Sequence, residues 1–338
     1  MIKHKRILTT FISIIITILL FIYLFDISDI EKIKTSMLSI EVNHFILYAI
    51  FSLSNAFFRA LRYKFLLVPV EVPLSSLFGV TLLRNLFVDM FPAKLGALSY
   101  PAILNQRYKV PIDFCLSSLF YSFLFDVIAL PPFLLFSLLI IGKANLYIPK
   151  MVFIIGSIVI IFVTAMIIIY LDHILKLANL ILYQIIDKLK LSDKKFFHTI
   201  KIKINDIVQA VEYLKAKGAI ILIFFLSIII RLFKYLGLYF LFSSICKFEE
   251  LISFKHFAQL IFGITAADFT AIFPLQFFGG YGTWETAWSL ILQLFDYKKL
   301  DAAIVGLTIH TYSQMWEYFV GFIAFCIIIL PYIIRKSK

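Results

Sequence analysis

Long apolar runs recur along the chain and limit its fold more than any other feature. Each run has about the 20 residues that an α-helix needs to cross ~30 Å of hydrocarbon. The runs are Ile7–Phe25, His44–Leu67, Phe114–Ile141, Met151–Leu171, Ala219–Leu241 and Ala302–Ile334. The chain is 62% hydrophobic and 15% charged, whereas a soluble domain is about half apolar and about a quarter charged. We therefore predict an all-α polytopic membrane protein.

The charges between the runs predict the orientation of the chain. Lys3, Lys5 and Arg6 precede the first run, and Arg335 and Lys336 follow the last one. Since loops rich in Lys and Arg stay in the cytoplasm, both termini are expected there, in a multi-pass protein of the cytoplasmic membrane. The net charge of +12 fits the same rule, so nucleic acid is not an expected partner.

Two segments fit poorly as full membrane spans. A span over the first segment, 75–107, would leave Lys94, Arg107 and Lys109 on the outer side, against the charge rule. A span over the end of the second segment, 255–295, would be too short. We predict about six full spans plus two re-entrant helical hairpins, with 75–107 on the cytoplasmic side and 255–295 on the outer side. An eight-span count is the alternative.

The order of spans and hairpins predicts an inverted repeat. The first half, 1–148, and the second half, 149–338, each contain two spans, a hairpin and one span, with opposite orientation. The lysine-rich segment 172–218 has apolar residues at helical spacing, which predicts an amphipathic cytoplasmic connector. The matching landmarks are Arg59 and Arg62 with Arg231 and Lys234, Phe91-Pro92 with Phe273-Pro274, and Asp126 with Glu317.

Helix-breaking residues concentrate in the two hairpins, most densely in the stretch FPLQFFGGYGTWETAW from Phe273 to Trp288. Non-helical backbone at membrane depth is tolerated only where protein or water covers it. We therefore predict a cavity lined by Pro92, Gly96, Pro274, Gly279, Gly280, Gly282 and Glu285. Close helix packing is the alternative for the glycines. For Glu285 the alternative is an acid in the first helical turn after an N-cap at Thr283.

Charged residues also lie inside the apolar segments. A charge at the bilayer centre costs about 2.5–3.5 kcal/mol on insertion scales, so these side chains should pair or line water. The predicted charge partners are Arg84, Asp89, Asp126, Asp268 and Glu317. The predicted lipid- or phosphate-binding residues are Arg59, Arg62, Lys94, Arg231 and Lys234.

Some of these residues have a second interpretation. Arg59 and Arg62 share a helix face and suit a forked phosphate contact, but they can also snorkel to the membrane boundary. His310, in the last run, is expected to be a packing residue rather than a proton relay. The sequence has no P-loop, H-E-x-x-H, G-x-S-x-G or cysteine cluster. We therefore assign no catalytic residue, metal or cofactor and favour a protein without enzymatic activity.

Three motifs carry a resemblance to a known family. FFRALRYKFLL, FPAKLGALSYP and FPLQFFGGYGTWETA occur in this order, and the chain resembles the lysylphosphatidylglycerol synthase transmembrane-region family of flippase-like integral membrane proteins. The element from Pro274 to Glu285 is the most specific part. Lys94 stands where the family usually has Arg, and Ala97 where it has an acid. An Arg that the family often has in the last span is absent, with His310 nearby.

The resemblance implies that the chain handles an anionic lipid, such as aminoacylated phosphatidylglycerol or a polyprenyl-phosphate-linked lipid. The first hypothesis is translocation of such a lipid, or of a lipid-linked glycan, through a central cavity formed by the two hairpins, alongside a separate synthase or transferase. The alternative is a membrane-embedded glycosyl or lipid-head-group transferase, or its obligate transmembrane subunit, with Asp89, Asp126 or Asp268 as base. A plain assembly factor is the third interpretation.

Overall fold

The computed structural model describes residues 30–67, 70–141, 169–188, 218–270 and 281–336, together with residue 22 and short pieces between 155 and 167. The predicted runs 7–25 and 151–171 lie largely outside these residues. So does the glycine-rich stretch 271–280, with Pro274, Gly279 and Gly280. Within the described residues the secondary structure is entirely helical.

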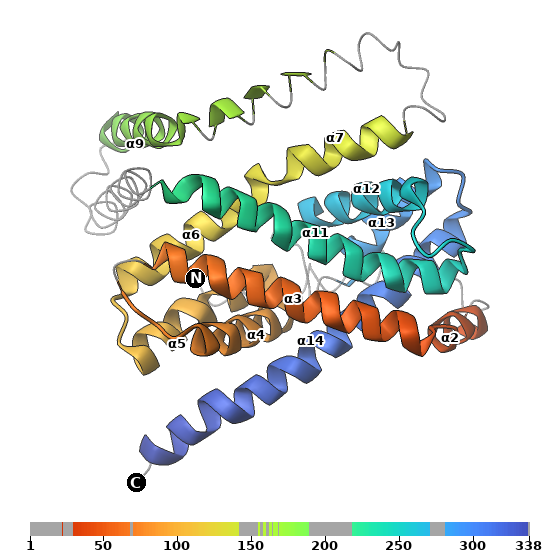
Figure 1. Cartoon of the computed structure of the whole chain (residues 1–338), viewed down its shortest axis with the longest axis horizontal. Coiled ribbons are helices and arrows are strands. Elements are labelled where there is room, and N and C mark those ends of the chain that lie inside the picture. The colour runs from red at the N-terminus through yellow and green to blue at the C-terminus, as the bar shows by residue number, and fades with distance from the viewer. Residues whose placement is uncertain are drawn as a thin grey trace.

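The helices follow one another in the order shown in Figure 1. They are α2 (Ile30–Leu38), α3 (Val42–Leu66), α4 (Leu74–Met90), the 3-10 helix η2 (Pro92–Leu98), α5 (Ser99–Tyr108), α6 (Ile112–Ile128), α7 (Leu130–Ile141), α9 (Leu171–Lys188), α11 (Ala219–Cys246), α12 (Phe254–Thr270), α13 (Thr283–Gln293) and α14 (Lys299–Lys336). Of the predicted amphipathic connector, α9 covers the first part, and residues 189–217 lie outside the described chain.

Four of the predicted runs are helices long and apolar enough to cross a membrane. They are Val42–Leu66, Ile112–Ile141, Ala219–Cys246 and Lys299–Ile334. The fold is therefore that of a polytopic all-α membrane protein, as the composition predicts. The second of these spans is interrupted at Ala129, where α6 ends and α7 begins. The interruption lies just before Pro131 and Pro132, whose rings lack an N–H and clash with the preceding turn.

The outward faces of these helices are apolar. Phe57 on α3 is 42% exposed, Phe225 on α11 is 58% exposed, and Phe322 on α14 is 62% exposed. Contiguous exposed apolar surface of this kind is typical of a membrane-facing surface. Apolar side chains of the spans thus face outward, and polar side chains of the spans lie in the interior.

Helices α3 and α11 form the central pair of the bundle and lie side by side in Figure 1. The backbone N–H of Glu41, before α3, donates to Ser244 Oγ at 2.8 Å. Further along, Asn55 Nδ2 donates to the carbonyl oxygen of Ile230 at 2.6 Å. Early residues of α3 thus meet late residues of α11, so the two helices are antiparallel. This agrees with opposite orientations of the two halves, but the complete inverted repeat stays a prediction.

Each predicted hairpin packs its two arms together and also contacts the other half of the chain. In the first hairpin α4 packs against η2 and α5, and in the second α12 packs against α13. In addition, α4 packs against α14, and α12 packs against α7. The turn of the first hairpin is tight, because a Cβ on Gly96 would lie 1.7 Å from the carbonyl oxygen of Phe87. How far the hairpins enter the membrane stays a prediction.

The buried apolar residues form two separate cores. The first core surrounds α4 and α5, with the end of α3, most of α6, the start of α11 and the end of α14. The second core surrounds α12 and α13, with the start of α3, Phe133 of α7, the end of α11 and the start of α14. Four helical spans therefore run through both cores. Between the cores, the same spans carry the polar side chains that make up the candidate site.

Candidate functional site

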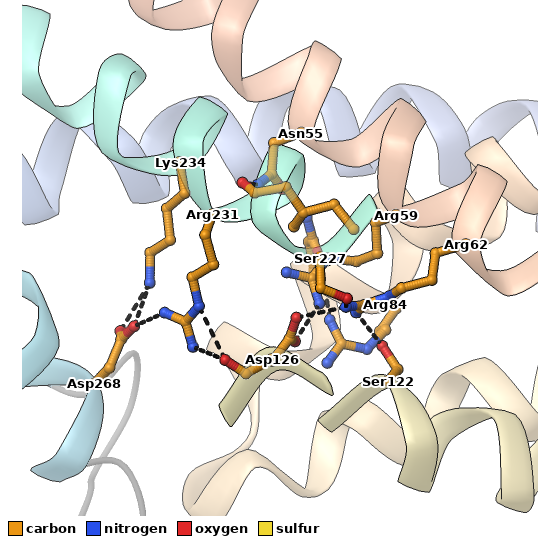
Figure 2. Close-up of polar contacts among 12 residues, drawn as sticks. Asn55, Arg59, Arg62, Arg84, Ser122, Asp126, Ser227, Arg231, Lys234 and Asp268 are labelled. Carbon is orange, nitrogen blue, oxygen red and sulfur yellow. Dashed lines mark hydrogen bonds and ion pairs between the residues drawn. The ribbon is translucent and has the colours of Figure 1, made fainter. Parts of the chain in front are cut away.

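A polar layer separates the two apolar cores. We define it by the polar side chains that the spans and hairpin arms place between the cores, most of which Figure 2 labels. They are Asn55, Arg59 and Arg62 of α3, Arg84 and Asn85 of α4, Ser122 and Asp126 of α6, Ser227, Arg231 and Lys234 of α11, Asp268 of α12, and Glu317 of α14. The layer gathers residues far apart in the sequence, from both halves of the chain.

Asp126 is the centre of the first ion-pair cluster. Arg59 Nη1 donates to Asp126 Oδ2 at 3.0 Å, and Arg62 Nη1 donates to Asp126 Oδ1 at 2.8 Å. Arg62 is fully buried, and it also donates to Ser227 Oγ at 2.7 Å and to Ser122 Oγ at 2.5 Å. The two arginines reach one carboxylate because residues three apart share a helix face.

Asp268 is the centre of the second cluster. Arg231 Nη1 donates to Asp268 Oδ2 at 2.9 Å, and Lys234 Nζ lies 2.8 Å from Oδ1 and 2.7 Å from Oδ2. The two clusters are joined, since Arg231 Nε and Nη2 donate to the backbone carbonyl oxygen of Asp126 at 3.2 and 3.0 Å. The Lys234 side chain is 31% exposed, so this end of the layer is the more open one.

These contacts argue against one interpretation of the Arg59 and Arg62 pair, and the phosphate contact stays a prediction. Burial of Arg62 excludes snorkelling, because a snorkelling side chain keeps its charged head in water. Each aspartate pairs with two cations, in matching Arg-x-x-Arg and Arg-x-x-Lys arrangements. The acids, however, come from non-equivalent elements. Asp126 pairs with the cations of α3, and Asp268, rather than Glu317, pairs with those of α11. The landmark match of Asp126 with Glu317 is therefore not reproduced in the ion pairing.

Arg84 is the fifth cation of the layer, labelled in Figure 2, and comes from α4, which packs against the α3 helix of the first cluster. It is 7% exposed, donates from Nη1 to Asn85 Oδ1 at 3.2 Å, and places its guanidinium carbon 5.6 Å from the ring centre of Phe123. Asn85 in turn donates to Glu317, which interacts electrostatically with Asp89, Arg59 and Lys234. An amide, rather than a direct ion pair, thus connects Arg84 to the nearest acid of α14.

Glu285 lies in a second buried polar group, at the start of α13. Its Oε2 accepts a hydrogen bond of 2.7 Å from the backbone N–H of Gly282, and its Oε1 contacts His310 Nδ1 of α14. His310 Nε2 lies 2.8 Å from Gln314 Nε2, and the imidazole lies between the rings of Tyr281 and Trp284. Since the Gln314 Nε2 group can only donate, His310 Nε2 is the acceptor of this contact, and the matching neutral tautomer carries its proton on Nδ1, toward Glu285. Glu285 is therefore an acid in the first turn of α13, as the alternative interpretation predicts, and it also pairs with His310; its place in a cavity stays a prediction.

The N-cap of α13 is Gly282, and the expectation of Thr283 at that position is wrong. Gly282 has a φ of 88°, a conformation that a Thr side chain would make costly. Thr283 is instead the first helical residue. Of the other hairpin residues, Pro92 and Lys94 belong to η2, although the structure does not describe their side chains. The Lys94 prediction therefore stays untested.

Sequence reasoning missed the neutral partners of the charges. Asn55, Ser122 and Ser227 are ordinary polar residues in apolar runs, and no charge draws attention to them. A periodic signal was nevertheless present: Ser122 lies four residues before Asp126, and Ser227 lies four residues before Arg231. Polar residues at this spacing share one helix face with the charge.

Two of the three carboxylates in the layer are engaged by cations. Asp126 and Asp268 are both held in ion pairs, so neither is a free base. Across the described residues, no group of three or more His, Cys, Asp or Glu side chains could hold a metal ion. What the arrangement offers is a buried set of hydrogen-bond donors with positive charge.

The long apolar helices with an ion-paired interior define a multi-pass α-helical membrane protein. Its sequence matches the lysylphosphatidylglycerol synthase TM region over residues 10–321, nearly the whole chain. The chain therefore belongs to this family. Comparisons with curated proteins and with solved structures found no match.

Proposed function

We propose that the protein translocates an anionic lipid or a polyprenyl-phosphate-linked lipid across the cytoplasmic membrane, with the polar layer as the site that its charged group crosses. Membership of a lipid-related membrane family supports a lipid as the substrate. The two hairpins bring α4 and α12 to the layer from opposite cores, which suits a path with access from both sides.

The observation that carries the proposal is the excess of cations in the buried layer. Among the described residues, five basic side chains face four carboxylates in and around it: Arg59, Arg62, Arg84, Arg231 and Lys234 against Asp89, Asp126, Asp268 and Glu317. Intramembrane charges are expensive and mark substrate pathways in membrane proteins. An excess of guanidinium and ammonium groups favours a substrate that carries a phosphate.

The transferase alternative receives less support from the geometry. It needs a carboxylate free to take a proton near a lipid phosphate. Asp126 and Asp268, two of the three candidate bases, are each clamped by two cations. A carboxylate held between two cations strongly prefers to stay ionised, which makes it a weak base.

The test is lipid movement by the purified protein in phosphatidylcholine vesicles. Labelled phosphatidylglycerol, labelled polyprenyl phosphate and labelled phosphatidylcholine are compared by their exposure to an external quencher. We expect at least one anionic lipid to cross faster than phosphatidylcholine. Lys234→Gln should slow it roughly tenfold, the effect of losing one charge-assisted contact of about 1.4 kcal/mol.

Lys234 suits this test because Asp268 stays paired with Arg231 when the Lys234 ammonium group is removed. The matched control is Lys255→Gln, which removes an exposed lysine at the start of α12 and should leave the rate unchanged. Equal movement of charged and zwitterionic lipids by folded wild-type protein, or no movement of any, would overturn the proposal.

A further inference from the structure

Arg84 has the least direct charge compensation of the buried cations in the layer. Arg59, Arg62, Arg231 and Lys234 each make an ion pair with Asp126 or Asp268. Arg84 instead contacts the Asn85 amide and the face of Phe123. Its Nε is buried and has no hydrogen-bond partner among the described residues. A buried donor that stays unpaired is costly, so this one points to a group that the chain itself does not supply.

Three further unpaired donors lie on the neighbouring face of α3. They are the Nε atoms of Arg59 and Arg62 and the hydroxyl of Tyr63, all buried and without a partner in the described part of the chain. Tyr63 stacks on Tyr100 at 4.1 Å between ring centres. Helix α3 packs against α4, and α4 packs against α5, which carries Tyr100. The donors of α3 and α4 therefore lie on adjoining helices.

The chemistry of these donors selects an anion with several oxygens. All four are N–H or O–H groups, and three belong to guanidinium groups with fixed planar geometry. They come from two helices, and a tetrahedral phosphate presents acceptor oxygens in several directions, whereas a carboxylate presents two oxygens in one plane. The nearest acids do not take this role: Asp126 is occupied by Arg59 and Arg62, and Glu317 is separated from Arg84 by Asn85.

We propose that Arg84, with the unpaired donors of Arg59, Arg62 and Tyr63, forms a binding site for a phosphate group. The inference deepens the proposed function, on which it rests for the lipid head group as the source of the phosphate. Free inorganic phosphate has the same chemistry, so the experiment must separate the two sources. Arg84 is the residue to test because it takes no part in the ion pairs that hold the layer together.

The experiment measures the thermal unfolding of the full chain in a neutral detergent. The added probes are phosphatidic acid, phosphatidylglycerol, phosphatidylcholine or inorganic phosphate. A ligand that binds only the folded protein raises the melting temperature in proportion to its occupancy. We expect an anionic phospholipid to raise it more than phosphatidylcholine does. Arg84→Gln should reduce the apparent affinity for that lipid at least ~10-fold, and Arg84→Lys should keep part of it.

The matched control is Arg107→Gln. The Arg107 guanidinium also lies 5.6 Å from an aromatic ring centre, that of Tyr108, and its Nη1 is likewise a buried donor without a partner among the described residues, but it comes from the end of α5 rather than from α3 or α4, which carry the four donors of the proposed site. This variant should bind the anionic lipid like the wild type. Without lipid, Arg84→Gln should melt no lower than the wild type, since it removes a buried charge that has no direct counter-ion in the described part of the chain. A purely structural role for Arg84 predicts the opposite.

Each outcome decides a different point. Loss of lipid binding in Arg84→Gln alone supports the site, and an equal shift with inorganic phosphate would identify the free ion as the ligand and overturn the lipid source. Unchanged lipid binding in Arg84→Gln, or equal loss in Arg107→Gln, overturns the site. Lipid binding that depends on Arg84 without movement in vesicles would refute the proposed function and leave the site standing.

Discussion

Replacing Asp126 with Asn tests whether the ion-pair cluster stabilises the bundle. The substitution keeps the size of the side chain and one acceptor oxygen but removes the charge that Arg59 and Arg62 share. Arg62 cannot relax into water, because its side chain is 0% exposed. The remaining contacts of Arg62, with Ser122 and Ser227, are to neutral hydroxyls. The variant therefore leaves a buried guanidinium without its counter-charge.

The size of the effect follows from this burial. Removing one partner of a buried ion pair costs about 3–5 kcal/mol because the other charge remains buried. For domains of about 150–250 residues, 1 kcal/mol corresponds to roughly 2–4 °C in melting temperature. On this scale, Asp126→Asn should lower the melting temperature by roughly 6–20 °C. Replacing both members with neutral groups costs much less, so Arg62→Met combined with Asp126→Asn should recover part of the loss.

The assay is thermal unfolding of detergent-purified protein, read by the loss of the monodisperse peak in size-exclusion chromatography. Glu249→Gln is the control, since this exposed acid lies in the loop after α11 and its loss should have little effect. A double-mutant cycle separates the pair from the single effects. An unchanged melting temperature in Asp126→Asn, or a double variant as unstable as the sum of the single ones, would refute the reasoning.

Three further substitutions test the packing around the two hairpins. Gly96→Ala should reduce the yield of monodisperse protein severalfold, because its Cβ would lie 1.7 Å from the Phe87 carbonyl oxygen; a normal yield would contradict the tight turn. His310→Leu should lower the melting temperature, since it removes the partner of the fully buried Glu285, and adding Glu285→Gln should recover part of the loss; no recovery would argue against the pair. Trp288→Ala should lower the free energy of unfolding by about 3–5 kcal/mol, because this fully buried ring fills the second core. A decrease below ~1 kcal/mol, measured by chemical unfolding, would contradict that role.

Several features of the fold could be predicted from the sequence because they depend on composition along one segment. The runs that became α3, α11 and α14 are apolar over about the length of a membrane span, and in lipid such a segment satisfies its backbone only as a helix. The interruption near Pro131 follows from the missing N–H of proline. The sequence also indicated that the intramembrane charges must pair or line water, because lipid cannot solvate them.

The partners of those charges were decided by the tertiary structure. From the sequence, a forked phosphate contact and a snorkelling pair are equally consistent with Arg59 and Arg62. Their ion pairs with Asp126 become known only when the position of α6 is known. Likewise, nothing near Glu285 in sequence indicates that His310, 25 residues later, will contact it. Such contacts depend on the distance between helices that are remote in sequence, and local periodicity carries no information on that distance.

The sequence by itself therefore determined that the chain is a bundle of membrane helices with costly charges inside. Only the tertiary structure decided that Asp126 and Asp268 each compensate two cations and that Arg84 has no direct counter-ion among the described residues. The physical reason is that the cost of burying a charge is a property of one residue in lipid, whereas its compensation is a property of a pair in space.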